Sequence, residues 1–198
     1  MTKKLRHEPL YVAPGIVGWI DSHENPIVYD EIRNEHLNPD DVFDKIKIYE
    51  RQVEEWFINR ATDLLEKENY SLIVLMVCLS YLEGVEQYRR GESSRGRSQE
   101  FFVGAFKRLY PNKYSDNDLE DFYRQARCGL FHNGMIESRI IFSNSRFRLA
   151  LKFSPNSDIE VNPKLLLRDV KKDFRKYIGE LKKNQALRDV FHSRFSIR

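Results

Sequence analysis

Residues 71–90 read SLIVLMVCLSYLEGVEQYRR, and this stretch decides the fold. Its first turns are apolar at almost every position, so a helix formed here is expected to be surrounded by protein on all sides. Ser71 can cap the helix start. Glu83 and Glu86 follow the apolar run before it reaches the roughly 20 residues that cross a bilayer. We therefore expect a buried central helix and no membrane segment.

Amphipathic helices are predicted on both sides of this stretch. Before it, apolar residues recur at three- and four-residue steps from Val42 to Leu64, and Asn38 with Pro39 supplies a helix start. After it, three helices are expected: 98–110, one capped by Ser115 and ended by Asn133-Gly134, and one opened by Asn162-Pro163. Residues 185–198 can add a short terminal helix outside the bundle. The predicted fold is mainly α, an up-and-down bundle of four to five helices with a small β-hairpin insertion near residues 139–161.

Two segments do not follow helical spacing. Residues 1–37 contain Pro9, Pro14 and Pro26 between short apolar pieces, which predicts an extended N-terminal arm with one or two short strands. Residues 147–153 alternate apolar and polar side chains, and residues 139–142 can pair with them across a turn at 143–145. Residues 159–161 can add a third strand. The expected domains are the arm (1–37) and a helical domain (38–198).

Composition and cysteine usage narrow the class of protein. The chain has 198 residues, 41% of them hydrophobic, which suits one folded core. No secretory signal is recognisable, and Cys78 and Cys128 lie in predicted apolar helices, so we interpret them as buried thiols in a cytoplasmic protein. No paired Cys or His spacing, Walker sequence or HExxH is present, so no metal and no cofactor are expected.

The charge of the chain is unevenly distributed. The net charge is +3, but residues 164–198 hold eleven Lys/Arg and four Asp/Glu, a balance of +7. A basic segment of this kind suits an anionic partner such as RNA. The alternative is that these side chains only solvate the outer face of a helix.

Residues 123–134, YRQARCGLFHNG, carry the candidate chemistry. Arg127 lies on or beside the buried face of a predicted helix, and His132 follows where the helix ends at Asn133-Gly134. A histidine titrates near neutrality and can move a proton, while an arginine is a permanent, planar phosphate binder. On an α-helix these side chains are rotated by roughly 140°, so they converge only if the helix unwinds or two copies combine.

This arrangement resembles the signature of HEPN domains, an Arg, four to six residues and a His near a helix end. The resemblance implies a metal-independent endoribonuclease in a toxin or defence context, with RNA as substrate and a composite site in a homodimer. It also implies an antitoxin or another protein partner. The commonest active pattern has a polar residue directly after the Arg, whereas Cys128 stands here. The alternative is a non-catalytic HEPN module for protein or nucleotide binding and dimerisation.

Other residues are assigned supporting and RNA-binding roles. Glu83 and Asn133 are the expected supporting residues, and Glu83 or Glu86 is expected to pair with Arg127, because an unpaired buried carboxylate is costly. In the structural alternative, Arg127 only makes this ion pair and His132 only interacts with the helix C-terminus. The predicted RNA-binding residues are Arg146, Arg148 and Lys152. The alternative is that they form a solvated strand face.

Overall fold

The computed structural model describes residues 4–67, 69–143, 149–154 and 158–197, with the side chain of Asn133 also outside the described part. The chain divides into two compact units. Unit 1 comprises residues 1–60, 88–92 and 175–198, and unit 2 comprises residues 61–87 and 93–174. Two long helices, α3 (Ser71–Arg90) and α6 (Pro163–Lys183), contribute residues to both units.

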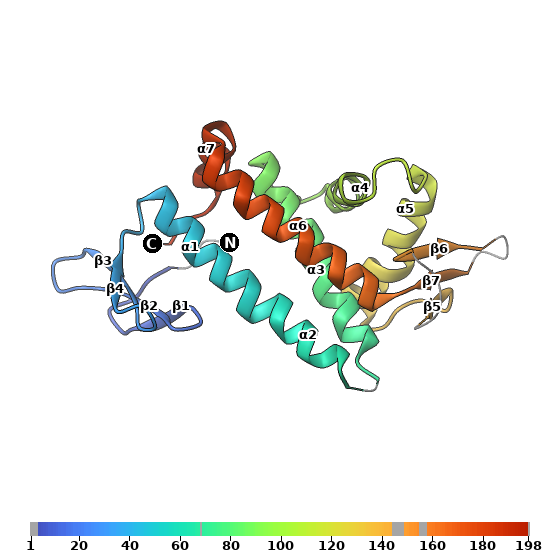
Figure 1. Ribbon diagram of the computed structural model, residues 1–198, viewed down its shortest axis with the longest axis horizontal. Helices are drawn as coiled ribbons and strands as arrows, with labels where there is room; N and C mark the ends of the chain where they lie inside the picture. The colour runs from blue at the N-terminus through green and yellow to red at the C-terminus, as the bar shows by residue number, and fades with distance from the viewer. Residues whose placement is uncertain (1–3, 68, 144–148, 155–157, 198) are drawn as a thin grey trace. The chain divides into compact units, whose positions relative to one another are not determined.

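The fold is mixed α and β, so the expected helical bundle with one hairpin is wrong. The first reason is the N-terminal region, where a four-stranded antiparallel sheet replaces the expected arm (Figure 1). Its strands, in spatial order, are β1 (Leu10–Ala13), β2 (Ile16–Ile20), β3 (Pro26–Asp30) and β4 (Glu35–Leu37). Gly15, Glu24 and Asn34 adopt positive φ in the three connections, which allows the chain to reverse within a few residues.

A continuous run of helix follows this sheet in unit 1. The predicted helix is present, although its N-cap is Asp41 and not Asn38: the Asp41 carboxylate accepts from the N–H groups of Phe43 (2.9 Å) and Asp44 (3.0 Å). The run passes from α-helix into one turn of π-helix and back. Its parts are α1 (Val42–Val53), η1 (Glu54–Ile58) and α2 (Asn59–Leu65), the last of which continues into unit 2.

An ion pair between β3 and α1 and an aromatic cluster are among the contacts that hold unit 1 together. Arg51 of α1 donates to Asp30 of β3 at 2.7 Å. Burial alone would raise the pKa of Asp30, but Arg51 and the backbone N–H groups of Ile32 and Arg33 outweigh it and hold that pKa below its ordinary value. The cluster joins α1 to the end of α3, to α6 and to α7 (Gln185–Arg194). Its rings are those of Tyr49, Tyr88, Tyr177, Phe191 and Phe195.

Helix α3 supplies the core of unit 2, as its sequence predicts. Its Val74, Leu75, Cys78, Leu79 and Leu82 are fully buried, and burial raises the pKa of the Cys78 thiol. Among the described residues, α3 is the one helix long and apolar enough to cross a membrane by length and composition. That criterion is weak, because the core helix of a globular domain meets it equally well.

The second sheet, which lies in unit 2, has three strands, and its pairing differs from the predicted hairpin. Strand β7 (Ile159–Val161) is central, β5 (Ile140–Phe142) pairs with it in parallel, and β6 (Leu151–Phe153) pairs with it in antiparallel orientation. Strands β5 and β6 therefore do not pair with each other, and residues 147 and 148 of the predicted hairpin lie outside the described residues. Ile159 and Val161 are fully buried, so the third predicted strand provides the apolar centre of the sheet.

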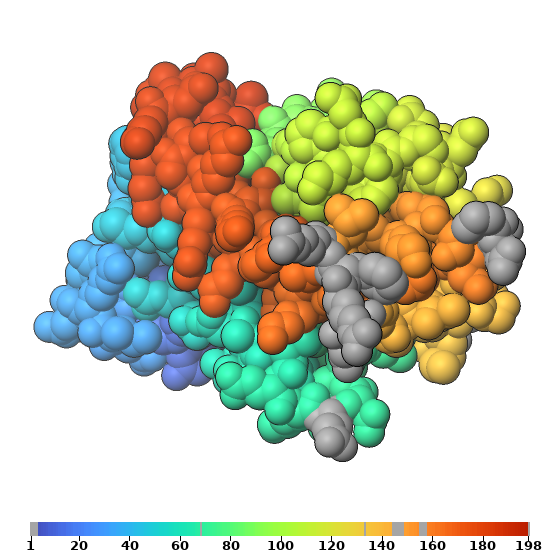
Figure 2. Space-filling view, turned by 45° about the vertical axis from the view of Figure 1, so that its right-hand side comes forward, coloured from blue at the N-terminus to red at the C-terminus, as the bar shows by residue number. Residues whose placement is uncertain are grey.

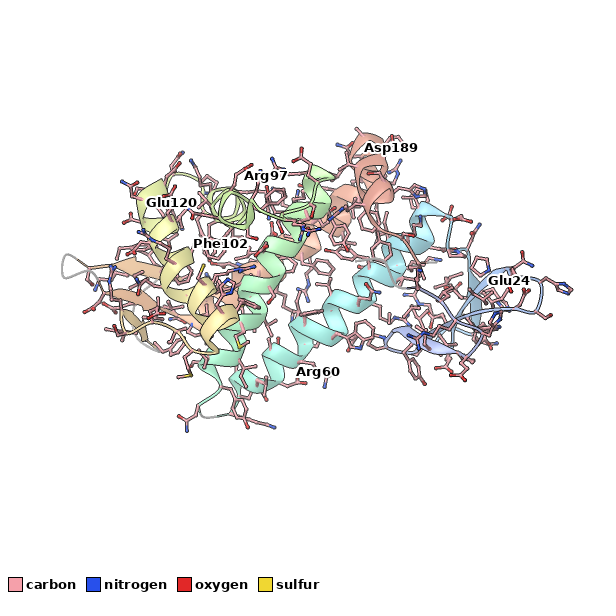
Figure 3. All side chains as sticks on the ribbon, turned by 180° about the vertical axis from the view of Figure 1, so that it is seen from behind. Glu24, Arg60, Arg97, Phe102, Glu120 and Asp189 are labelled. Atoms are coloured by element: carbon pink, nitrogen blue, oxygen red, sulfur yellow. The ribbon has the colours of Figure 1, made fainter. Side chains whose placement is uncertain are left out.

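The remaining helices of unit 2 pack around an aromatic core. Ser115 caps the second of them, which begins at Asp116, with a capping box to Asp118, as predicted. Phe102 contacts the rings of Phe122 and Tyr123, and Figure 3 shows it among these helices. The hydroxyl of Tyr114, which lies between the first two of these helices, bonds to both backbone groups of Leu151 at 3.2 Å. Figure 2 shows this yellow-green part of the chain next to the orange residues of the second sheet on the surface. The helices are α4 (Ser98–Leu109), α5 (Asp116–Phe122) and the π-helix η2 (Tyr123–Asn133).

Candidate functional site

The candidate motif lies on a π-helix, which the sequence did not predict. Helix η2 runs over eleven residues from Tyr123 and ends at Asn133, before Gly134 in the left-handed conformation (φ 74°). The end at Asn133-Gly134 is as predicted. Most π-helical segments are single turns inserted into α-helices, frequently at functional sites. The length of η2 therefore draws attention to the motif it carries.

Close packing of the following segment requires a glycine in η2. A Cβ on Gly129 would lie 2.6 Å from the carbonyl oxygen of Met135 and 3.3 Å from the nitrogen of Glu137. The Glu137 N–H donates to the Gln125 carbonyl at 3.0 Å, so the chain returns directly over the helix backbone. Gly129 therefore fixes how the segment after His132 leaves the motif.

The wide helical turn changes the geometry of the Arg–His pair. In a π-helix each N–H donates to the carbonyl five residues back, so the turn is wider and residues five apart are separated by a smaller rotation than on an α-helix. Arg127 and His132 have this separation, so the π-helical backbone brings them closer to one side of η2. The rotation of roughly 140° expected for an α-helix does not apply. His132 is exposed in the last turn, and Arg127 is mostly buried.

Arg127 is held by Glu83, the partner expected from the sequence. Its Nε and Nη2 atoms lie 3.1 and 3.0 Å from Oε2 of Glu83. The other carboxylate oxygen accepts the Ser94 hydroxyl at 2.8 Å. Within the described part of the chain, these contacts leave Nη1 of Arg127 for a further acceptor. The guanidinium is thus fixed in direction and retains one edge for a ligand.

Two aromatic rings flank the same guanidinium. The Cζ atom of Arg127 lies 5.6 Å from the ring centroid of Tyr123 and 5.0 Å from that of Phe131. Burial raises the pKa of Tyr123; the positive charge of Arg127 opposes this shift, and a side-chain hydrogen bond with Cys128 adds to it. Cys128 is therefore engaged with Tyr123, beside the arginine.

The other predicted site residues are less informative. Lys152 is in β6 and pairs across the sheet with Glu160 (2.9 Å), which offsets its charge toward a phosphate. Arg146 and Arg148 lie outside the described residues, as does the side chain of Asn133. Glu86, the second acid considered for Arg127, pairs with Arg108 instead.

A second polar cluster in unit 2 was not predicted. Arg108 of α4 lies between two buried carboxylates: its Nε is 3.0 Å from Glu86, and its Nη1 bonds to Asp173. Tyr81 donates to the other oxygen of Asp173 at 2.9 Å. Burial opposes the charged form of Arg108, but the two carboxylates outweigh it and raise its pKa. This cluster ties α3, α4 and α6 together.

The described residues contain no group of His, Cys, Asp and Glu side chains that could hold a metal ion. The chain matches no known protein family, no curated protein and no solved structure. The geometry of η2 and its neighbours is therefore the basis for a functional proposal.

Sequence reasoning missed Ser94, Tyr123 and Phe131 as parts of this site. Tyr123 and Phe131 stand four residues before and after Arg127, a spacing at which helical side chains meet, so that signal was available. Ser94 lies in a polar linker eleven residues after Glu83, and nothing in its local sequence points to that carboxylate.

Proposed function

We propose that this protein is an RNA-binding, metal-independent endoribonuclease of the HEPN type, with Arg127 and His132 as the reacting pair. The observation that carries the proposal is the π-helical step, which supports placement of both side chains on one side of η2. The basic segment after residue 163 supports an anionic substrate, since Lys164 and Lys172 are exposed on α6.

The proposed reaction uses the 2′-hydroxyl of the RNA as nucleophile. Neutral His132 takes the hydroxyl proton as the 2′-oxygen bonds to phosphorus. Nη1 of Arg127 stabilises the charge on the non-bridging oxygens. The bond to the 5′-oxygen breaks, and that oxygen leaves with a proton from a protonated His132 of a second copy in a homodimer. The products are a 2′,3′-cyclic phosphate and a 5′-hydroxyl.

Cleavage of labelled RNA in the presence of EDTA tests this proposal. His132→Ala is expected to lower the rate by about 10²–10⁴-fold, the usual loss on removing a general acid–base. Arg127→Lys is also expected to cut poorly, because a point charge does not replace the guanidinium. The matched control is His192→Ala, since His192 is likewise exposed in the last turn of a helix. A His132→Ala protein that cuts as fast as the wild type would refute the assignment.

A second candidate function is a non-catalytic HEPN module that binds a protein or nucleotide. The ion pair with Glu83 favours it, because the carboxylate offsets the charge of Arg127 and repels a phosphate. In that case no RNA is cut, and His132→Ala leaves RNA binding and self-association unchanged. The cleavage assay with parallel binding measurements separates the two functions.

A further inference from the structure

Phe131, the residue before His132, is a large aromatic side chain that remains 44% exposed. Met135, in the segment that returns over η2, is 61% exposed. Phe131 therefore presents a reachable ring surface on η2, the helix that carries the proposed reacting pair.

The ring is also held in place. The Arg127 guanidinium lies 5.0 Å from its centroid, and Glu83 holds that guanidinium through Nε and Nη2. Within the described part of the chain, the Arg127 guanidinium is the group that interacts with the Phe131 ring. A ring whose orientation is already restricted loses little further freedom when a planar ligand stacks on it.

We propose that Phe131 is a stacking platform for an unpaired nucleobase next to the scissile phosphate, so that the substrate class is single-stranded RNA. Every base has a π face, and stacking on aromatic side chains is a general mode of single-strand binding. Bases inside a duplex are stacked on each other and do not offer such a face. This inference rests on the proposed function, because it places the base beside the phosphate that Arg127 and His132 would bind.

Equilibrium binding to fluorescently labelled RNA tests the platform without cleavage. The full chain carries His132→Ala throughout, and the probes are a short single strand of mixed sequence and the same strand annealed to its complement. The variants are Phe131→Ala, Phe131→Leu and Phe131→Trp, with circular dichroism to confirm folding. Phe57→Ala is the matched control, because Phe57 is 40% exposed and also lies in a π-helical segment, η1.

Phe131→Ala and Phe131→Leu are expected to weaken single-strand binding by roughly 5- to 150-fold, the range for loss of one stacked base. Phe131→Trp and Phe57→Ala should retain wild-type affinity. Duplex binding should be weaker and insensitive to Phe131. A 2-aminopurine base in the strand should be quenched on binding only when residue 131 is aromatic.

Three results would overturn the inference. The first is an unchanged single-strand affinity in Phe131→Ala while the parent protein still binds RNA, which leaves the proposed function standing. The second is recovery of binding by Phe131→Leu, which would show that apolar packing is sufficient. The third is loss of self-association in Phe131→Ala with RNA affinity intact, which would assign this surface to a second copy. A parent protein that binds no RNA at all would refute the platform and the proposed function together.

Discussion

Arg127 and Glu83 form an ion pair from which water is largely excluded, with side-chain exposures of 18% and 13%. The pair joins η2 to α3 in unit 2. Both oxygens of the carboxylate are used, one by Arg127 and one by Ser94. Loss of the acid thus leaves a mostly buried guanidinium without its counter-charge.

Glu83→Ala is expected to lower the free energy of unfolding by about 3 kcal/mol, as breaking one side of a buried pair does. The check is urea denaturation followed by circular dichroism. Lys107→Ala is the control, because the pair of Lys107 with Asp116 is 52% and 61% exposed and should contribute less than about 1 kcal/mol. Equal effects of the two changes would show that the buried pair does not stabilise the unit.

Gly129→Ala is expected to destabilise the protein by about 1–3 kcal/mol, since the new methyl group meets the Met135 carbonyl at 2.6 Å. Gly84→Ala is expected to have the opposite effect. Gly84 lies inside α3 with nothing within 4 Å of a new Cβ, so this substitution should raise the free energy of unfolding by about 0.5–1 kcal/mol. Thermal unfolding of both variants measures the contrast. A stable Gly129→Ala protein would mean that the segment after η2 does not pack against it.

Arg108→Met is expected to cost about 3–5 kcal/mol, because it removes the cation that bonds to the buried carboxylates of both Glu86 and Asp173. Replacing all three with apolar residues of similar size should recover most of this loss. Denaturation of the single and triple variants tests both statements. If the triple variant is no more stable than the single one, the cluster provides more than charge neutralisation.

Asp30→Asn should make stability less sensitive to acid. The pKa of Asp30 is lowered in the folded protein, so its contribution is present above its unfolded pKa of about 3.9 and is lost as the pH falls through the lower, folded value. The wild type should therefore lose more unfolding free energy between pH 7 and pH 3 than Asp30→Asn does. Parallel slopes for the two proteins would contradict the ion pair with Arg51.

Local signals in the sequence were sufficient for the helices. The apolar run that begins at Leu72, the capping Ser115 and the Asn133-Gly134 end each act through neighbouring residues, and the structure confirms all three elements. The sheets depend on pairings between distant segments. Ile140 pairs with Ile159 across nineteen positions in parallel, and no local pattern distinguishes that from a hairpin.

The candidate site shows the same division. The pairing of Arg127 with Glu83 was expected, because a buried carboxylate on an apolar helix needs a counter-charge. The π-helix was not expected from the sequence. It occurs together with the packing of Met135 and Glu137 against Gly129, which no local sequence pattern indicates. Whether the pair catalyses RNA cleavage stays a prediction.

Unit 1 draws on both ends of the chain, which has a consequence for synthesis. A ribosome releases the N-terminus first, so the sheet β1–β4 and helix α1 emerge well before residues 175–198. At that stage Tyr49 lacks its contacts with the rings of Phe191 and Phe195, which complete its cluster. Nascent chains stalled before residue 175 should accordingly be cut by proteases within residues 4–60, and resistance there should appear only when the last helix has left the exit tunnel.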